Sequence, residues 1–389
     1  MPTRPKPDPG DASDRRSLLV KARRVVVKLG TGVVCTAEHE FDRHHVTALA
    51  NGIAALVRDG RQVVLVSSGA ITLGAAELGI HRSRLRDASV NRACAAVGQC
   101  KLMEAYAEIF RPHGLKVAQV LVTEDDFTDL NRYLILRQTF EKLLKLGAIP
   151  IVNENDTVTN IYTEQAPVFR DNDLLAALVL SKLDAQALIL LSNVDGLLRI
   201  VDGAPDPGDV VSLVTEVTEA VRESASGKSA TGRGGMTAKL DAAEIAMQAG
   251  GLVVIANGRA PRVLERVFAG ENVGTLFLPG AQRLAGKRRW LAFASSVRGQ
   301  VTINANACKA LLNGHASLLL SGVIACKGAF SSGQVIAVVD SDGSAIGRGI
   351  AECGSHEITD SLSSGAAAKG VLVRRENFLI FSGKEQSRA

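Results

Sequence analysis

The sequence predicts an α/β protein: a three-layer α/β/α sandwich around a mostly parallel central sheet, followed by a small β-barrel-like domain. Runs of valine, isoleucine and leucine recur between residues 24 and 256, as expected for parallel strands covered on both faces. Longer amphipathic stretches separate these runs, which indicates βαβ units. After residue 280 the pattern changes to short strands spaced by glycine, asparagine and aspartate. Two folded units also suit the length of 389 residues.

The individual elements follow from these patterns in order along the chain. In the first unit we expect strands at residues 24–28, 62–66, 116–121, 149–152, 187–191 and 252–255. Amphipathic spacing predicts helices at residues 44–57, 90–110, 130–146, 176–183 and 237–248. In the second unit we expect strands at residues 299–303, 334–339, 345–350 and 378–380.

These patterns divide the chain into four parts. We expect a disordered extension at residues 1–19, the α/β domain at 20–280, a linker at 281–296 and the C-terminal domain at 297–389. The extension is rich in proline, aspartate and arginine and lacks the apolar stretch of a signal peptide. No apolar run approaches the ~20 residues that a membrane span requires.

Composition narrows the class of protein. Hydrophobic residues make up 46% of the chain and the formal net charge is only +5, so we expect a globular protein without a nucleic-acid partner. The six cysteines include no C-x-x-C pair and no histidine at zinc spacing. They indicate reduced thiols and a cytoplasmic location.

Three short segments, each placed where an apolar strand ends, predict one phosphoryl-transfer site. They are residues 26–32, 67–70 and 169–173. Open α/β sheets bind their ligands outside the carboxyl ends of their strands. A lysine, two loops of small residues and a carboxylate cluster suit a substrate that carries several phosphates. The sequence therefore predicts a kinase.

Lys28 closes the first strand, and Gly30 and Thr31 follow it. Small residues here let backbone N–H groups approach a nucleotide phosphate, and Lys28 would stabilise the migrating phosphoryl group. The alternative is a surface lysine beside an ordinary turn. A dinucleotide-binding loop is excluded, because the third glycine of that motif is missing.

The second segment comprises Ser68, Gly69 and Ala70 at the end of the second strand. Its hydroxyl and N–H groups could bind an anionic substrate. The alternative is a helix-capping serine beside a packing glycine. A third polar turn follows the strand at 149–152, where Asp156 could hold a substrate ammonium and Asn153 a carboxylate. An ordinary polar turn is the alternative there.

The segment Asp171, Asn172 and Asp173 lies at the start of an apolar helix. Its two carboxylates would repel each other unless cations neutralise them. We expect Asp173 to organise the active lysines, and Asp171 and Asn172 to face the substrate. The alternative is a double N-cap of that helix.

A glycine-rich loop leads into the helix that carries Lys239. Flexible backbone donors followed by a lysine suit the terminal phosphates of ATP, so Lys239 would be the second cationic clamp. A solvated surface loop is the alternative. The other residues expected to bind ATP are Ser192 and Asn193 at a strand end, and Gly234, Gly235, Met236 and Thr237 in the loop.

A carboxylate substrate is already ionised, so the reaction needs no general base. Catalysis would rest on positioning, the two lysines, backbone donors and Mg²⁺. We expect no cluster of metal-ligating side chains.

Together these segments resemble the glutamate 5-kinases of the amino-acid kinase superfamily. The motifs that carry the resemblance are Val27-Lys28-Leu29-Gly30-Thr31, Ser68-Gly69-Ala70, Asn153-Glu154-Asn155-Asp156, Asp171-Asn172-Asp173 and residues 232–239. The C-terminal part resembles a PUA domain, around Lys327-Gly328, Ser332-Gly333-Gln334-Val335 and Ile346-Gly347-Arg348-Gly349.

The resemblance implies ATP-dependent phosphorylation of the L-glutamate γ-carboxylate, the first step of proline biosynthesis, with proline as feedback inhibitor. It implies that Lys28 and Lys239 clamp phosphate and that Asp173 positions them. It assigns Ser68, Asp156 and Asn172 to glutamate, and Ser192, Asn193 and the loop at 234–239 to ATP. Two departures stand out: Arg170 replaces a glycine, and Asn193 replaces an aspartate.

Two alternatives remain. Related kinases act on acetylglutamate, aspartate, carbamate or uridylate, and the Asn-Glu-Asn-Asp and Asp-Asn-Asp motifs together favour free glutamate over these. The C-terminal module could instead bind RNA, although residues 297–389 are not strongly basic and are poor in aromatic residues. For that module we favour a regulatory role or an oligomer contact, and we expect a homo-oligomer, a dimer or tetramer.

Overall fold

A computed structural model describes residues 9–158, 171–201, 204–225, 235–280, 297–313, 316–364 and 370–381. The chain divides into two compact units. One comprises Met1–Thr123 and Thr139–Arg283, and the other comprises Glu124–Gln138 and Leu284–Ala389. Residues 124–138, expected in the first domain, thus group with the second unit. The predicted linker at 281–296 lies outside the described residues.

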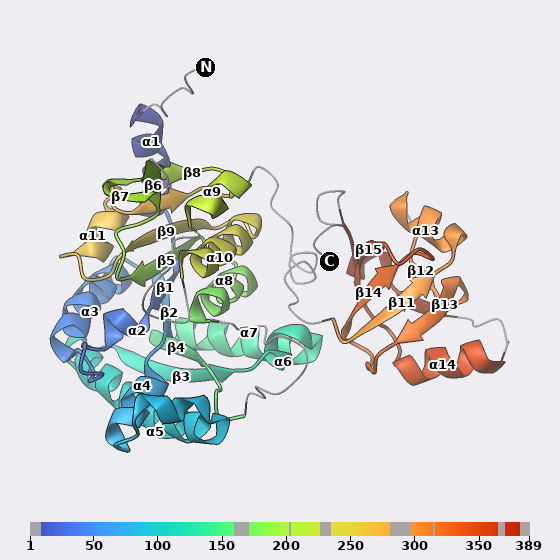
Figure 1. Cartoon of the computed structure of the whole chain (residues 1–389), viewed down its shortest axis with the longest axis horizontal. Helices are drawn as coiled ribbons and strands as arrows, with labels where there is room; N and C mark the ends of the chain where they lie inside the picture. The colour runs from blue at the N-terminus through green and yellow to red at the C-terminus, as the bar shows by residue number, and fades with distance from the viewer. Residues whose placement is uncertain are drawn as a thin grey trace. The chain divides into compact units, whose positions relative to one another are not determined.

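An eight-stranded, mostly parallel sheet forms the centre of the first unit (Figure 1). β1 pairs in parallel with β2 on one side and β5 on the other. β10 pairs antiparallel with β9 and parallel with β8, so these two edge strands run opposite to the rest. In spatial order the strands are β3 (Lys116–Val122), β4 (Ala148–Glu154), β2 (Gln62–Ser67), β1 (Arg24–Leu29), β5 (Ala187–Ser192), β9 (Leu252–Asn257), β10 (Thr275–Phe277) and β8 (Leu213–Val214).

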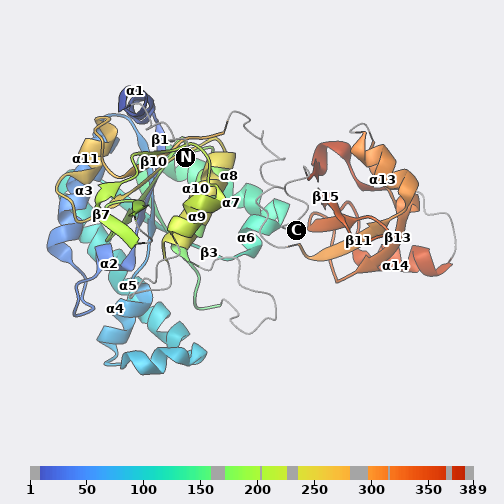
Figure 2. The same cartoon turned by 45° about the horizontal axis from the view of Figure 1, so that its top comes forward.

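Helices cover both faces of this sheet (Figures 1 and 2). Val25 and Val27 of β1 pack with Leu102 of α5 and Leu264 of α11 in one buried core, while α8 and α10 lie on the opposite face. The α-helices of this unit are α1 (Pro9–Val20), α2 (Thr31–Val34), α3 (Arg43–Arg58), α4 (Ala70–Glu77), α5 (Ala88–Phe110), α8 (Asn172–Lys182), α9 (Glu219–Ser224), α10 (Met236–Gln248) and α11 (Val263–Phe268). Helix α6 (Asp125–Thr128) and the first part of α7 (Leu130–Lys145) fall in the segment that groups with the second unit. A separate pair of strands, β6 (Leu198–Val201) and β7 (Ala204–Val210), completes the described elements of the unit. The predicted three-layer architecture is confirmed.

The six strands predicted in the first unit are all present, and each continues one to three residues beyond its predicted bounds. The added residues include Ser67, Glu154 and Ser192, which are polar. Apolar periodicity ends at the last buried side chain, but a strand is held by backbone hydrogen bonds that do not depend on side-chain polarity. The sheet thus delivers polar side chains directly to its carboxyl edge.

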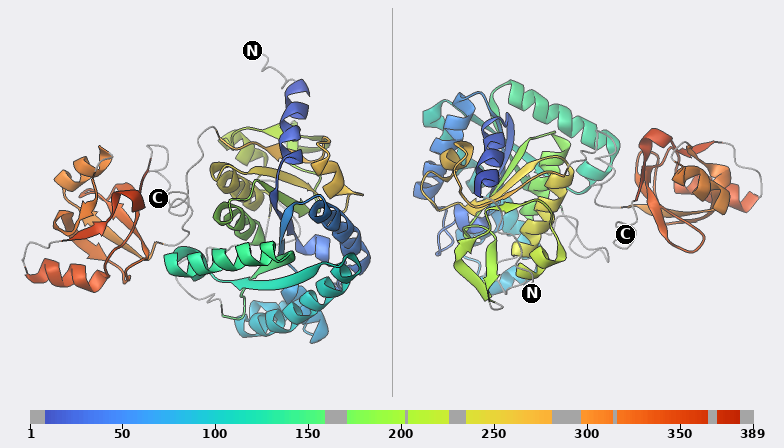
Figure 3. Two further views of the ribbon diagram at one scale, coloured as in Figure 1. Left: turned by 180° about the vertical axis from the view of Figure 1, so that it is seen from behind. Right: turned by 90° about the horizontal axis from the view of Figure 1, so that it is seen from above.

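The N-terminal segment differs from the prediction. Residues 9–20 form helix α1, so the expected disorder at residues 1–19 is wrong for the described part, residues 9–19 (Figure 3). Two residues explain this, because Leu19 and Arg16 are both buried. The Arg16 guanidinium donates hydrogen bonds to the carbonyl oxygens of Val273 (2.9 Å), Gly274 (2.9 Å), Ser212 (3.0 Å) and Glu271 (3.3 Å). Burial lowers the pKa of Arg16 to about 10, which leaves it charged at neutral pH.

Replacement of Arg16 by alanine is therefore expected to lower the free energy of unfolding by about 2–4 kcal/mol, because several buried carbonyl groups lose their donor. The measurement is urea unfolding followed by circular dichroism. Arg15→Ala is the matched control, since Arg15 is exposed on the same helix, and it should change the value by less than about 0.5 kcal/mol. Equal effects of the two substitutions would show that the Arg16 contacts do not hold the helix.

The second unit contains a five-stranded mixed sheet with a core of its own. All four predicted C-terminal strands are present, and helices as well as strands contribute to the core. Its main elements are β11 (Gly299–Ile303), α13 (Ala305–Leu312), β12 (Leu318–Leu319), β13 (Val323–Lys327), β14 (Val335–Val339), β15 (Ala345–Ile350), α14 (Ser355–Ser364), β16 (Val371–Val373) and β17 (Phe378–Ile380). In the described part of the chain, no helix has the length and apolarity to span a bilayer.

Candidate active site

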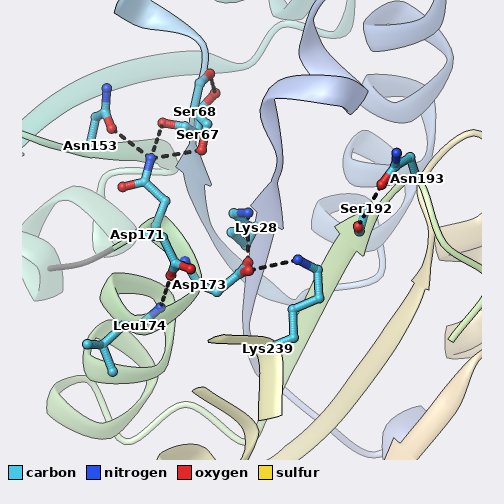
Figure 4. Close-up of polar contacts among 11 residues, drawn as sticks. Lys28, Ser67, Ser68, Asn153, Asp171, Asp173, Leu174, Ser192, Asn193 and Lys239 are labelled. Atoms are coloured by element: carbon cyan, nitrogen blue, oxygen red, sulfur yellow. Dashed lines mark hydrogen bonds and ion pairs between the residues drawn. The ribbon is translucent and has the colours of Figure 1, made fainter. Parts of the chain in front are cut away.

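Two lysines and one aspartate meet at the carboxyl edge of the sheet (Figure 4). Lys28 comes from the end of β1, Asp173 from the first turn of α8, and Lys239 from the first turn of α10. Lys28 Nζ lies 2.7 Å from Asp173 Oδ1, and Lys239 Nζ lies 3.0 Å from Asp173 Oδ2. One carboxylate thus holds two ammonium groups that are far apart in the sequence.

All three side chains of this cluster are buried, and Asp173 is only 1% exposed. Burial by itself would raise the pKa of Asp173, but the charges of Lys28 and Lys239 outweigh it and hold that pKa below its ordinary value. Asp173 therefore stays ionised, and the cluster carries one net positive charge. Such a preorganised cation suits an anionic group that gains charge during a reaction.

Asp171 caps helix α8. Its Oδ1 accepts hydrogen bonds from the backbone N–H groups of Asp173 (2.9 Å) and Leu174 (3.1 Å). Its Oδ2 is buried and accepts no hydrogen bond from a described residue. Burial and then the neighbouring charge of Asp173 raise the pKa of Asp171. The capping alternative is thus correct for Asp171, and its Oδ2 remains available to a ligand.

The side-chain amide of Asn172, at the start of α8, contacts residues at the ends of two strands, β2 and β4. Its Nδ2 lies 2.9 Å from Ser68 Oγ, 3.2 Å from the Ser67 carbonyl oxygen and 2.9 Å from Asn153 Oδ1. Asn153 Nδ2 in turn donates to Gln99 Oε1 at 3.1 Å. Both ends of the Asn153 amide therefore engage protein groups, and Asn153 is only 4% exposed.

A glycine is the N-cap residue of the helix that follows each of two strands of the site, β1 and β2. Gly69 has φ +106°, a left-handed conformation that favours glycine, and caps α4 immediately before Ala70. Gly30 caps α2, which starts at Thr31, and a Cβ at Gly30 would lie 3.4 Å from Lys28 Nζ. A Cβ at Gly30 would therefore touch the lysine at an ordinary contact distance.

The helix that carries Lys239 begins without a side-chain cap. Gly235 is the N-cap residue, and Met236 and Thr237 form the first turn, so their N–H groups face no capping side chain. Gly234 and Arg170 lie outside the described residues. At the end of β5, Ser192 Oγ donates to Asn193 Oδ1 at 3.3 Å, and Asn193 is exposed. Asp156 lies half-buried in the turn after β4.

The sequence matches two family models, one over each part of the chain. Residues 23–257 match the amino acid kinase family, and residues 299–369 match the PUA domain. The first match spans more than half of the chain and contains the lysine–aspartate cluster.

The chain belongs to the amino acid kinase family.

Its curated relatives include three proteins named glutamate 5-kinase. The one from Myxococcus xanthus is 42% identical and covers 89% of this chain and 90% of its own. That from Geobacter sulfurreducens is 39% identical over 89% of this chain and 91% of its own. That from Desulfotalea psychrophila is 39% identical over 95% of this chain and 99% of its own. Within the family, this chain groups with the glutamate 5-kinases.

The structure brings together the residues predicted from the sequence at three strand ends. Lys28, Asp173 and Lys239 are in contact, and Ser68, Asn153 and Asn172 form one hydrogen-bonded group beside them. Among the described residues, no group of three or more histidine, cysteine, aspartate or glutamate side chains could hold a metal ion.

Sequence reasoning missed Arg259, which follows β9. Its guanidinium donates to the carbonyl oxygens of Gly32 (3.1 Å) and Cys35 (3.2 Å) and pairs with Asp42 at 2.9 Å. These contacts fix the loop after Lys28. The sequence does contain a sign of this role. A polar Asn-Gly-Arg segment follows an apolar strand, as polar residues do at the other segments of the site.

Asn193 stands where the resemblance implies an aspartate, but another carboxylate lies nearby. Asp195 lies two residues beyond Asn193, is exposed, and its Oδ1 accepts a hydrogen bond from Asn257 Nδ2 at 2.9 Å. Asn257 ends β9, next to Ser192 at the end of β5. A negative charge thus remains close to the expected nucleotide contacts.

Substitution of Asp171 by asparagine separates its two roles. Asparagine caps a helix as well as aspartate, so the free energy of unfolding should change by less than about 0.5 kcal/mol. If Oδ2 contacts the substrate, KM for the substrate acid should rise about tenfold. The control is Asp87→Asn, the same change at the cap of α5. Unchanged kinetics in Asp171→Asn would show that capping is its whole function.

Proposed function

We propose that this chain transfers the γ-phosphoryl group of ATP to the γ-carboxylate of L-glutamate, the first step of proline biosynthesis. The observation that carries the proposal is the buried Lys28–Asp173–Lys239 cluster, set beside the polar group of Ser68 and Asn172. The names of the relatives indicate glutamate as the substrate, and the two lysines of the cluster suit the transfer of a phosphoryl group.

In the proposed reaction an oxygen of the ionised γ-carboxylate attacks the γ-phosphorus of ATP. A new P–O bond forms, the bond from that phosphorus to the β–γ bridging oxygen breaks, and ADP leaves with the electron pair. Lys28 and Lys239 stabilise the charge on the transferring oxygens, and Asp173 holds both lysines in place. No side chain has to remove a proton, because the nucleophile is already ionised.

The remaining site residues bind the two substrates in this proposal. Ser68, Gly69, Ala70, Asp156 and Asn172 bind glutamate. ATP is bound by backbone N–H groups near Gly30 and Gly235, at the uncapped helix starts, and by residues near Ser192 and Asn193.

Magnesium is expected to accompany ATP. Mg²⁺ in kinases is held by substrate phosphates and one or two carboxylates, with water completing its shell. Because Asp171 is expected to face glutamate, Mg²⁺ would be held mainly by the phosphates of ATP and by water. When bound, Mg²⁺ would neutralise phosphate charge.

The test is ATP turnover with hydroxylamine present to trap an acyl phosphate as its hydroxamate. We expect hydroxamate with L-glutamate and little with N-acetylglutamate, aspartate or carbamate. Activity with one of the other acids instead would show that this member of the family acts on a substrate other than glutamate. The absence of turnover with all of them would overturn the proposal.

Three further properties belong to this proposal. Proline shares the ammonium and carboxylate of glutamate, so it should raise the apparent KM for glutamate.

A homo-oligomer is expected, which size-exclusion chromatography with light scattering would test. The six free cysteines suit a reducing cytoplasm.

A further inference from the structure

We propose that Gln99, on helix α5, is a positioning residue for the amino-acid end of the substrate. It acts as the last acceptor of three linked amides, Asn172, Asn153 and Gln99, which we call the amide relay, and so stabilises the one direction in which they are aligned. The inference rests on the proposed function, because it assumes a substrate with an ammonium and a carboxylate on one carbon.

The direction of the amide relay starts from a single backbone group. Asn172 Nδ2 lies 3.2 Å from the carbonyl oxygen of Ser67, which can only accept a hydrogen bond. The amide of Asn172 must therefore present its NH₂ group to that oxygen. Its Oδ1 then lies on the opposite branch of the amide, where no described residue donates to it.

The other two amides follow in sequence. Because Asn172 presents its one NH₂ group to its neighbours, the Asn153 atom 2.9 Å away must be the acceptor Oδ1. Asn153 therefore turns its Nδ2 toward α5, where it needs an acceptor and meets Gln99 Oε1 at 3.1 Å. If either amide were reversed, two donors would face each other.

Gln99 takes this orientation at a cost to its own hydrogen bonding. The side chain is only 7% exposed, and its buried Nε2 has no hydrogen-bond partner within the described part of the chain. A buried donor without a partner is unfavourable, so the orientation of Gln99 is imposed by Asn153. This orientation of Gln99 supports, through Asn153, the orientation of Asn172 at the far end of the amide relay.

The far end has the polarity that an α-amino acid requires. Asn172 Oδ1 can accept from a substrate ammonium. Ser68 Oγ accepts from Asn172 Nδ2 at 2.9 Å, which leaves the Ser68 hydroxyl hydrogen to donate to a substrate carboxylate. Reversal of the amide relay would exchange acceptor for donor at Asn172, and a donor repels an ammonium group.

Helix α5 supports the same site at a second point. Tyr106 lies two turns after Gln99 and so on the same helix face. Its hydroxyl lies 2.7 Å from Ser67 Oγ. The residue whose carbonyl sets the direction of the relay is thus held from α5 as well.

The experiment compares Gln99→Met, which removes the acceptor, with Gln99→Glu, which keeps it. Gln99→Met should raise KM for glutamate about tenfold, the value of one hydrogen bond, with KM for ATP changed less than about twofold. Gln99→Glu should restore most of the affinity. Asn91→Leu is the control, since it removes another buried amide from α5, one that donates to Leu85, and should leave KM for glutamate unchanged.

A second measurement uses glutarate, which lacks the ammonium group, as a competitive inhibitor. Its inhibition constant should be similar in wild type and Gln99→Met, because glutarate makes no use of the Asn172 acceptor. An unchanged KM for glutamate in folded Gln99→Met, a Gln99→Glu protein as impaired as Gln99→Met, or equal weakening of glutarate and glutamate would each overturn the proposal. Absence of glutamate turnover in the wild type would instead overturn the proposed function, and the inference with it.

Discussion

Lys239→Ala is expected to lower kcat by at least about a thousandfold while the protein remains folded. Lys239 Nζ lies 3.0 Å from Asp173 in a buried position, so its charge is held where the transferring phosphoryl group needs it. Removal leaves Asp173 paired with Lys28 at 2.7 Å, so this buried carboxylate keeps a counter-charge. The effect should therefore fall on turnover and not on folding.

The measurement is the rate of glutamate-dependent ADP formation, with thermal unfolding recorded in parallel. Lys101→Ala is the matched control, because Lys101 also pairs with a carboxylate (Glu77, 2.9 Å) but lies exposed on α5. It should retain wild-type turnover. A folded Lys239→Ala protein with normal kcat would show that the cluster has no part in phosphoryl transfer.

Asp173→Asn is expected to damage stability and activity together. The substitution keeps the size of the side chain but removes the buried carboxylate charge that pairs with Lys28 at 2.7 Å and with Lys239 at 3.0 Å. Removal of one partner from a buried ion pair costs about 3–5 kcal/mol. Turnover should fall to background, because neither lysine is then held in position.

The same substitution should change how stability depends on pH. The pKa of Asp173 is lowered in the folded protein from its ordinary value of 3.8. Its contribution is therefore fully present above pH 3.8 and is lost as the pH falls through the lower folded value. The wild type should lose this contribution in acid, whereas Asp173→Asn lacks it at every pH.

Urea unfolding of both proteins at a series of pH values between neutral and strongly acidic tests this expectation. Asp241→Asn is the control, since Asp241 pairs with Arg222 at the surface and its loss should cost less than about 1 kcal/mol. Parallel stability curves for wild type and Asp173→Asn would contradict the assignment of the buried cluster.

The sheet and the lysine–aspartate cluster could be predicted from the sequence because both rest on local signals. Six of the eight strands are apolar runs that the sequence reveals; Lys28 lies at the end of the first of them, and Asp173 lies at the start of the apolar helix α8. The fold rule that ligands bind at the carboxyl ends of strands then brings them together.

The amide relay could not be predicted in the same way. Asn153 and Gln99 are 54 residues apart, and Gln99 lies within a long helix whose sequence gives no sign of a site. The role of Asn153 is an example: the sequence suggested a direct substrate ligand, whereas the structure engages both ends of its amide within the protein.

Helix α1 was missed for a related reason. Its segment is rich in charged residues and proline, which favours disorder when judged locally. Arg16 bonds to carbonyl groups 196 to 258 residues away, and such contacts exist only after the sheet has formed. Tertiary hydrogen bonds thus override the local composition.

The central claim is that a carboxylate oxygen of glutamate attacks the γ-phosphorus of ATP at this site. Its most direct test uses glutamate labelled with oxygen-18 in the γ-carboxylate, with hydroxylamine trapping the acyl phosphate. Hydroxylamine attacks the carbonyl carbon, so the released phosphate keeps the oxygen that bridged carbon and phosphorus. We predict phosphate that carries one labelled oxygen, formed in step with the hydroxamate. Phosphate without label would mean that water attacks ATP, and would contradict the proposed reaction.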